Sequence, residues 1–388
     1  MLERSLKNKL VSMLKVFPIV SLTGPRQSGK STLLRNSFPE YSYVSLEDPD
    51  LRQLAENDPR SFLKQFNSKA IFDEIQRTPE LFSYIQGVVD EQNEPGQYLL
   101  SGSQNFLLLK GISQSLAGRV SIQHLLPLSY AELANTAFVP HDLDDFMFLG
   151  GYPRLVVNDI APSDFFPSYM RTYLERDVRE ELGVKKIDSF THFITACALR
   201  TGEVLNVENL ANECDISVKT ARDWISILHA SFIIFLLQPF HKNYGRRLTK
   251  SPKMYFYDTG LACNLIGIEQ KNDVLTHHKR GNLFENAVVV EIIKQYYSLG
   301  KRPQLYFWRD SNQNEIDLVI EKGGKAQYAI EIKSTATFNP NAFSTLNKLG
   351  PIMGLDRCQR IVAYGGTQSY ETKQGQVLGL PDLNRLVI

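Results

Sequence analysis

The segment at residues 24–31 restricts the fold of this chain more than any other feature. It reads GPRQSGKS and lies between an apolar stretch at 18–23 and a helix-forming stretch that follows. The spacing matches G-x-x-x-x-G-K-[ST], a loop whose glycines allow backbone N–H groups to surround phosphate oxygens. The helix after the loop adds the positive end of its dipole. The segment therefore predicts a strand, a phosphate-binding loop and a helix, which together begin an α/β domain.

Each residue type in this loop has a chemical role. We expect Lys30 to contact the β- and γ-phosphates of ATP, and the Ser31 hydroxyl to ligate Mg²⁺. Gly24, Gly29 and Thr32 complete the predicted cofactor-binding set. The alternative is a glycine turn that only caps a helix, and the strand-loop-helix context disfavours it.

Length and composition set the outer limits. The chain has 388 residues, 43% hydrophobic and 22% charged, which predicts two or three globular domains. The formal net charge of +1 excludes a protein that coats nucleic acid by bulk charge, although a local basic patch stays compatible. The four cysteines are widely spaced and predict neither a disulfide framework nor a zinc site. The N-terminal segment lacks a secretory core, and no apolar run approaches the roughly 20 residues of a membrane span. We therefore expect a cytoplasmic protein with no membrane partner.

Short apolar runs alternate with helix-length segments over the first third of the chain, which predicts a parallel sheet with crossover helices. The predicted strands are 18–23, 43–46, 69–72, 97–100 and 119–123. The third strand runs into Asp73 and Glu74, the acids of a Walker B site. Asp73 would hold Mg²⁺ through water, and Glu74 would polarise the attacking water. An Asp-Glu pair after a strand is more often a solvated turn, but the phosphate-binding loop reverses that reading.

Two further residues are candidates for the catalytic set. Ser103 follows the fourth strand, where a γ-phosphate sensor would lie, and a plain turn is the alternative. Arg119 precedes the fifth strand, and we expect it to reach the phosphate of a neighbouring subunit. The alternative is an arginine that caps helix carbonyls. An arginine finger that acts on the site of a neighbouring subunit requires more than one copy of the chain. We therefore expect a homo-oligomer.

These motifs together resemble a known family. GPRQSGKST, IFDEIQ, LLSGSQNF and SLAGRV, followed by GGYPR and YLERDV, resemble prokaryotic AAA-type ATPases with a C-terminal domain of unknown function. The resemblance implies an α/β P-loop NTPase core (AAA+-like) at 1–128, a helical lid at 129–188, a winged helix-turn-helix at 189–262 and a restriction-endonuclease-like α/β domain at 268–388. Arg154 in GGYPR is the candidate for the lid's nucleotide sensor.

Residues 206–228 read as two helices around a tight turn, the pattern of a helix-turn-helix. The second helix would present Lys219 and Arg222 to nucleic acid, although such units often serve packing alone. The loop that follows favours DNA contact, because it is rich in cations and holds no acid. Its predicted phosphate contacts are Lys242, Arg246, Arg247, Lys250 and Lys253, with the Tyr244 ring available for stacking. Phosphate contacts imply no sequence readout.

Spaced carboxylates mark the last third of the chain. Asp317 and Glu331 lie on predicted strands that a hairpin can bring together, and Lys333 shares a strand face with Glu331. Two carboxylates that hold Mg²⁺ or Mn²⁺, with a nearby lysine, suit metal-assisted phosphodiester hydrolysis. With Glu285 upstream, on a segment that reads as helix or strand, the set resembles the PD-(D/E)xK nuclease fold. Cleavage and a retired nuclease that only binds both remain open.

The predicted function is ATP hydrolysis by an AAA-type ATPase that acts on DNA. Mg²⁺ is expected in the ATP site, and a second Mg²⁺ or Mn²⁺ in the C-terminal domain. The rival interpretation is a nucleotide-controlled binding switch that cuts nothing. A protein remodeller is a weaker alternative, since no aromatic pore loop is visible.

Overall fold

The apolar runs predicted as strands in the first third of the chain form one parallel sheet in the computed structural model. The structure describes residues 2–103, 111–112, 115–174, 178–179, 186–240 and 251–387. Among these residues the sheet has five strands, in the order β2-β3-β4-β1-β5. Their bounds are β1 (Ile19–Thr23), β2 (Ser42–Ser45), β3 (Ala70–Asp73), β4 (Tyr98–Gly102) and β5 (Val120–His124). Because all neighbouring pairs are parallel, the residues that follow β1, β3 and β4 meet at one edge.

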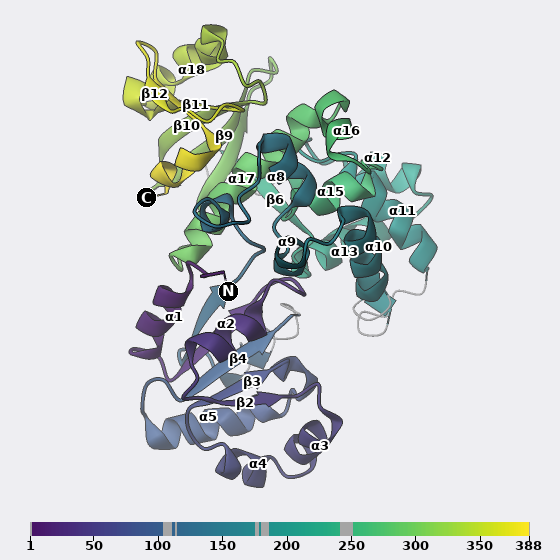
Figure 1. Cartoon of the computed structure of the whole chain (residues 1–388), viewed down its shortest axis with the longest axis vertical. Helices are drawn as coiled ribbons and strands as arrows, with labels where there is room; N and C mark the ends of the chain where they lie inside the picture. Colours follow the sequence, from purple (N-terminus) through teal and green to yellow (C-terminus); the bar gives the residue numbers. More distant parts are fainter. Residues whose placement is uncertain are drawn as a thin grey trace. The chain divides into compact units, whose positions relative to one another are not determined.

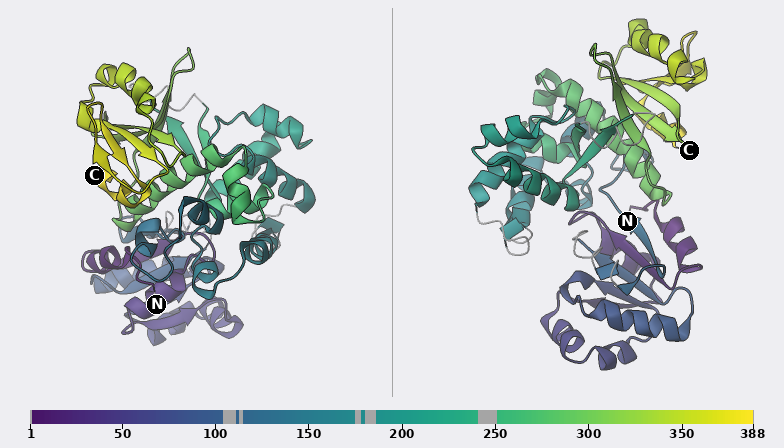
Figure 2. Two further views of the ribbon diagram at one scale, coloured as in Figure 1. Left: turned by 45° about the horizontal axis from the view of Figure 1, so that its top comes forward. Right: turned by 180° about the vertical axis from the view of Figure 1, so that it is seen from behind.

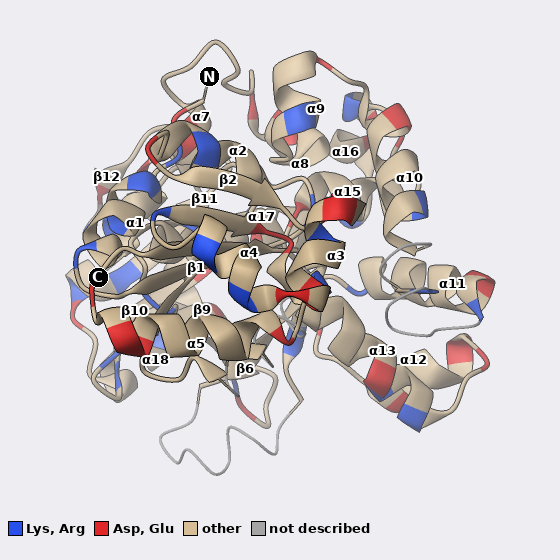
Figure 3. Cartoon of the chain, turned by 90° about the horizontal axis from the view of Figure 1, so that it is seen from below, with Lys and Arg blue, Asp and Glu red and all other residues tan. Residues whose placement is uncertain are grey.

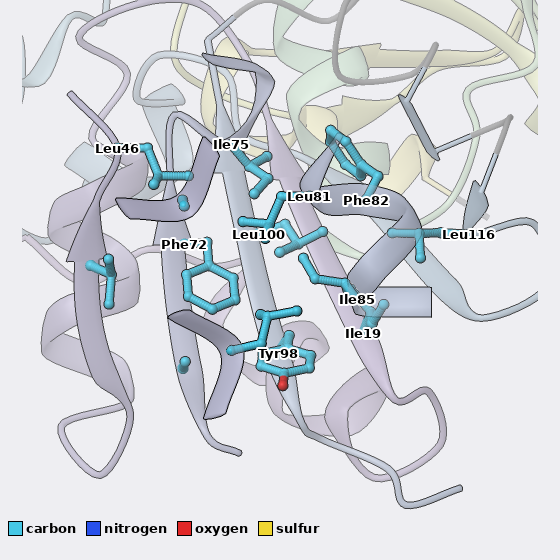
Figure 4. Close-up of a cluster of buried hydrophobic side chains, with 14 of the residues drawn as sticks. Ile19, Leu46, Phe72, Ile75, Leu81, Phe82, Ile85, Tyr98, Leu100 and Leu116 are labelled. Carbon is cyan, nitrogen blue, oxygen red and sulfur yellow. The ribbon is translucent and has the colours of Figure 1, made fainter. Parts of the chain in front are cut away.

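Helices cover both faces of this sheet (Figure 1). Successive strand residues point to opposite faces, so Ile71 packs with α1 and α2 while Phe72 packs with α4 and α5. On the second face the Phe72 ring lies 5.4 Å from the Tyr98 ring, stacked, and Leu100 and Ile85 belong to the same cluster (Figure 4). The helices are α1 (Lys7–Leu14), α2 (Lys30–Ser37), α3 (Pro49–Asn57), α4 (Pro59–Gln65) and α5 (Leu81–Gln92), with a 3₁₀ turn at Ile75–Arg77.

Two of these helices begin at an Asp-Pro pair for a local reason. Asp48 accepts a hydrogen bond from the Asp50 backbone N–H at 2.9 Å, and Asp58 accepts one from Ser61 at 3.0 Å. The proline that follows each aspartate takes the first helical position, where no backbone donor is needed. Local sequence alone therefore sets the starts of α3 and α4.

The chain divides into two units after Pro127, close to the predicted core boundary. The first unit is Met1–Pro127 with two later segments, Ala230–Phe232 and Tyr296–Lys301. The second unit consists of Leu128–His229, Ile233–Gln295 and Arg302–Ile388. The predicted division of the second unit into lid, winged helix and nuclease-like domain stays a prediction.

The helices of the second unit include the pair predicted as a helix-turn-helix. Trp224 of α13 packs on the rings of Phe190 and Phe193 of α11, at 5.0 and 5.3 Å between centroids. The apolar side of α13 is thus buried, as its spacing predicts. The helices are α7 (Tyr130–Leu133), α8 (Leu143–Leu149), α9 (Pro153–Asn158), α10 (Pro162–Tyr173), α11 (Ile187–Ala198), α12 (Val207–Glu213), α13 (Val218–Ala230), α15 (Thr259–Leu265), α16 (Lys271–Thr276), α17 (Arg280–Ser298) and α18 (Ser344–Leu349). Short 3₁₀ helices lie at Pro340–Phe343, Pro351–Met353, Arg357–Gln359 and Leu380–Leu386.

A second sheet joins two regions that the sequence analysis separates. Its order among the described residues is β12-β13-β11-β10-β9-β8-β6-β7, and Figure 2 gives two further views of it. The strands are β6 (Ile234–Pro239), β7 (Lys253–Phe256), β8 (Leu305–Arg309), β9 (Glu315–Lys322), β10 (Lys325–Lys333), β11 (Arg360–Tyr364), β12 (Tyr370–Glu371) and β13 (Gln376–Leu378). The predicted wing strands β6 and β7 pair antiparallel, but β6 also pairs with β8 through Gln238 and Tyr306. The expected break between residues 262 and 268 therefore does not separate the wing from the C-terminal sheet.

None of the described helices has the length and apolar character that a membrane span requires.

His124, at the end of β5, should make the first unit sensitive to acid. Its ring lies 4.9 Å from the Tyr297 ring and 5.8 Å from that of Phe232, and burial lowers its pKa to about 4. The folded state accommodates the neutral ring, and the pKa of histidine in the unfolded chain is about 6.5. The stabilisation of the fold by the neutral ring is therefore complete above about pH 6.5 and is lost as the pH falls from about 6.5 to 4. The loss is up to about 3 kcal/mol. Between pH 7 and pH 4.5, the melting temperature of a His124→Phe chain should therefore fall by less than that of the wild type. Equal losses in the two proteins would contradict the prediction.

Candidate active site

The phosphate-binding loop connects β1 to α2 and depends on glycine at two positions. Gly24 has φ +156°, and a Cβ there would lie 2.1 Å from the carbonyl oxygen of Leu125. Gly29 has φ +92° and directly precedes α2. Side chains other than hydrogen are strained or excluded at both positions. The backbone of the loop is thus shaped by its sequence and by its close approach to the segment after β5.

Lys30 is already held at the loop. Its Nζ donates to the carbonyl oxygens of Gly24 at 2.9 Å and Pro25 at 2.8 Å, and the residue is 5% exposed. Carbonyl oxygens are weaker partners for an ammonium than phosphate oxygens, which carry charge. The ammonium is therefore available to a phosphate bound at the loop, in exchange for these carbonyl oxygens.

The two predicted Mg²⁺ ligands lie around one tyrosine hydroxyl. Tyr43 of β2 donates to Asp73 Oδ2 at 2.6 Å and is also hydrogen-bonded to Ser31. Asp73 Oδ1 accepts a hydrogen bond from the Ser101 hydroxyl, at the position level with it on β4. Burial, and next the contact with Asp73, raise the pKa of Tyr43, so this phenol stays a donor. Hydroxyl and carboxylate oxygens are the ligands that Mg²⁺ prefers, so Ser31 and Asp73 fit this metal.

Glu74 and Ser103 are brought together at the same edge of the sheet. Glu74 adopts a left-handed backbone conformation, with φ +55°. Its Oε2 accepts hydrogen bonds from the Ser103 hydroxyl at 3.0 Å and from the Ser103 backbone N–H at 3.4 Å. The Gln76 side-chain amide donates to the same oxygen. The carboxylate is therefore fixed in direction by groups from the ends of β3 and β4.

Arg4 braces the loop and has no signal in the sequence. Its Nη1 donates to the Ser28 carbonyl oxygen and its Nη2 to that of Leu126, both at 2.7 Å. The side chain is largely buried and ties the loop to the segment after β5. Both partners are backbone groups far along the chain, and no local motif could have revealed the contact.

Arg119 lies at the amino-terminal ends of the parallel strands, because it precedes β5, whereas the loop lies at their carboxyl-terminal ends. It forms a two-pronged ion pair with Asp90 of α5, with Nη2 2.8 Å from Oδ2, and donates to the Ala117 carbonyl at 3.1 Å. This position keeps Arg119 away from the phosphates of its own unit. The role of Arg119 in trans stays a prediction.

The residues predicted to contact nucleic acid are divided by the structure. Lys219 and Arg222 are exposed on α13, next to the exposed Asp223, and Figure 3 shows acidic positions on α12 and positions of both signs on α13. Arg154, the predicted lid sensor, is exposed on α9. The loop residues Lys242, Tyr244, Arg246, Arg247 and Lys250 lie outside the described residues.

The prediction that Lys253 contacts nucleic acid is wrong. Lys253 begins β7 and is 3% exposed, and its Nζ lies 2.8 Å from Glu285 Oε1 and 2.5 Å from Glu315 Oε1. Burial opposes its charge, but Glu285, Glu315 and Asp317 outweigh this effect and raise the pKa of the ammonium. These buried ion pairs hold the ammonium away from the surface, where a phosphate of nucleic acid would bind.

Two carboxylates of the nuclease-like set, Glu285 and Asp317, lie near this lysine, and Glu331 lies near Glu285 and Lys333. Glu285 lies on α17, which settles the open choice in favour of a helix, and also accepts a hydrogen bond from Tyr255 at 2.5 Å. Asp317 Oδ2 accepts from the Ile332 backbone N–H at 2.7 Å, and burial followed by Glu285 and Glu331 raises the pKa of Asp317 well above its usual range. Burial likewise raises the pKa of Glu331, whose Oε1 lies 2.7 Å from Lys333 Nζ.

The expected second metal does not fit this cluster as the structure has it. Within the described ranges, no group of three or more His, Cys, Asp or Glu side chains is arranged to hold a metal ion. One feature points the other way, because Glu331 Oε2 is buried without a hydrogen-bond partner. A single open oxygen does not make a metal site, and the neighbouring acids already have protein donors.

The sequence relates this chain to known proteins. It is 32% identical over 326 residues to the uncharacterized protein Rv2008c of Mycobacterium tuberculosis, which is 82% of this chain and 71% of that protein. The uncharacterized protein Mb2031c of Mycobacterium bovis matches to the same extent. The chain belongs to the same family as these two mycobacterial proteins. The uncharacterized protein MJ1544 of Methanocaldococcus jannaschii is 22% identical over 356 residues, 82% of this chain and 77% of that protein.

Family models divide this member of the family into three parts. An AAA domain matches residues 16–134, and two domains of unknown function, DUF8612 and DUF4143, match residues 140–272 and 280–383. The first unit is accordingly an AAA-type P-loop ATPase domain, which confirms that part of the resemblance. Among solved structures, the Walker-type ATPase PABY2304 of Pyrococcus abyssi is 16% identical with a TM-score of 0.45, covering 68% of this chain and 96% of that one. AMPPCP-bound DnaA from Aquifex aeolicus is 14% identical with a TM-score of 0.32, covering 58% and 85%. Likenesses of this size carry no conclusion about function.

Proposed function

We propose that this protein hydrolyses ATP at the edge of the first sheet and uses the ATP cycle to control its hold on nucleic acid. The observation that carries the first part is the gathering of Lys30, Ser31, Asp73, Glu74 and Ser103 within one unit. These residue types at the ends of β1, β3 and β4 are those that phosphoryl transfer to water requires.

Each side chain has a step that its geometry suits. Lys30 would neutralise phosphate charge, and Ser31 and Asp73 would hold Mg²⁺, which supplies further charge neutralisation when bound. Glu74, aimed by Ser103, would accept a proton from the attacking water. Ser103 also lies where it could form a hydrogen bond with the γ-phosphate. Loss of that bond on hydrolysis would then change the end of β4. Arg119 is proposed to complete the site of a neighbouring subunit, after its exposed and hence weak ion pair with Asp90 opens.

The nucleic-acid part of the proposal rests on α13 and on the composition of the loop after β6. Lys219 and Arg222 are exposed on a helix whose other side is buried, an arrangement that is compatible with a groove-facing helix and supports the proposal. The loop adds cations without an acid. The rival proposal is a switch in which ATP state alters binding to another protein. Salt dependence separates the two, because phosphate contacts release counterions.

Replacing Arg246, Arg247 and Lys250 with Ala should flatten the salt dependence of duplex DNA binding. Each lost phosphate contact lowers the slope of log affinity against log salt by about 0.9. A second variant, Lys219→Ala with Arg222→Ala, tests α13 in the same way. The matched control removes three exposed lysines elsewhere, Lys322, Lys325 and Lys373, and should leave the slope unchanged. Slopes that are unchanged in both test variants would favour the protein-binding switch.

A further inference from the structure

Lys253 lies in the carboxylate cluster of the second unit, where it pairs with Glu285 and Glu315. We propose that its ammonium is a built-in counter-ion that takes the place of a divalent metal. The cluster then binds no Mg²⁺ or Mn²⁺, and the C-terminal domain does not cleave phosphodiesters by metal assistance. This inference concerns a different unit from the ATP site and does not rest on ATP hydrolysis.

The position of Lys253 follows from the way β7 is held. Asn286 of α17 accepts a hydrogen bond from the Phe256 backbone N–H at 2.7 Å and donates to the Phe256 carbonyl at 2.8 Å. This buried amide fixes the end of β7 against α17, one residue from Glu285. The backbone of β7, including Lys253, is therefore held beside the cluster.

Protein donors also occupy the acids that a metal would need. Glu285 Oε1 accepts from both Lys253 and Tyr255, whose own hydroxyl is buried. Asp317 uses one oxygen for the Ile332 backbone N–H, and Glu331 uses one for Lys333. Each of these three carboxylates thus has one oxygen engaged by protein donors, and Glu331 Oε2 is buried without a hydrogen-bond partner.

Charge points in the same direction. The carboxylates of Glu285, Glu315, Asp317 and Glu331 face the ammonium groups of Lys253 and Lys333, and Arg309 lies 3.7 Å from Glu315. A divalent cation among these acids would lie close to a buried ammonium and be repelled by it. Lys253 and a metal are therefore competitors for the same carboxylates.

Calorimetry on the full chain without nucleotide tests this competition, with MnCl₂ as the probe. Wild type and Asp317→Asn should give the same isotherm, because neither places Mn²⁺ in the cluster. Lys253→Met removes the ammonium and keeps an apolar stem of similar length, so its chain should bind one Mn²⁺ that the wild type does not bind. Adding Asp317→Asn to Lys253→Met should abolish that gain and so locate it in the cluster.

Thermal melting gives a second readout. Mn²⁺ should raise the melting temperature of Lys253→Met and leave that of the wild type unchanged, since a ligand stabilises only the fold that binds it. A wild-type chain that binds Mn²⁺ and loses it on Asp317→Asn would overturn the proposal. A folded Lys253→Met chain that gains no Mn²⁺ would also overturn it. If Lys253→Met does not fold, the comparison of wild type with Asp317→Asn still decides.

Discussion

A Glu74→Gln chain is expected to bind ATP as the wild type does and to hydrolyse it about 10²-fold more slowly or worse. Glutamine keeps the shape of the side chain and can still accept a hydrogen bond from Ser103, so the site should stay assembled. It cannot accept a proton from water, which is the step assigned to this carboxylate. Phosphate release under single-turnover conditions measures the rate, and a fluorescent ATP analogue measures binding.

The matched control for this variant is Glu80→Gln, the same chemical change at an exposed position just before α5. It should hydrolyse ATP at the wild-type rate. If Glu74→Gln also does so, the assignment of Glu74 as general base is wrong, whatever else binds at the loop.

Lys30→Ala should fail at an earlier step. The ammonium is expected to meet the phosphates before any bond is broken, so its loss should weaken ATP binding itself. A hydrogen bond to a charged group contributes about 1.5–3 kcal/mol, which corresponds to a fall in affinity of about 10- to 150-fold. Equilibrium titration with the fluorescent analogue gives this value directly.

Lys64→Ala is the control for lost charge in the same unit, since Lys64 is exposed on α4. It should bind ATP normally. Circular dichroism should show that Lys30→Ala remains folded, because the ammonium is replaced at a loop and not in the core of the sheet. Unweakened binding by folded Lys30→Ala would contradict the role given to this residue.

The first sheet was predictable because its signals are local. The apolar runs that form β1 and β3 end in a loop motif and in acids, and parallel strands bring such ends to one edge. Asp73 and Ser101 meet because they occupy level positions on β3 and β4. That register follows from the fold, and the motif at each strand end was enough to anticipate that these side chains lie together.

Contacts made at long range could not be anticipated. Tyr43 reaches Asp73 from a neighbouring strand, and Arg4 reaches the loop from before α1, without a motif in either case. Lys253 shows the reason most clearly. In the sequence it follows a run of basic residues and reads as one of them, whereas its burial depends on Glu285 and Glu315, far along the chain. Neighbours in space, not in sequence, decide whether a lysine meets solvent.

The most direct test of the central claim is phosphate release from ATP by the purified full-length chain, with Mg²⁺ and with or without single-stranded or duplex DNA. We expect Mg²⁺-dependent turnover that changes when DNA is added and that falls by about 10²-fold or more in Glu74→Gln. ATP that binds at the loop but gives no phosphate above background, in any of these mixtures, would contradict the claim that this site hydrolyses ATP.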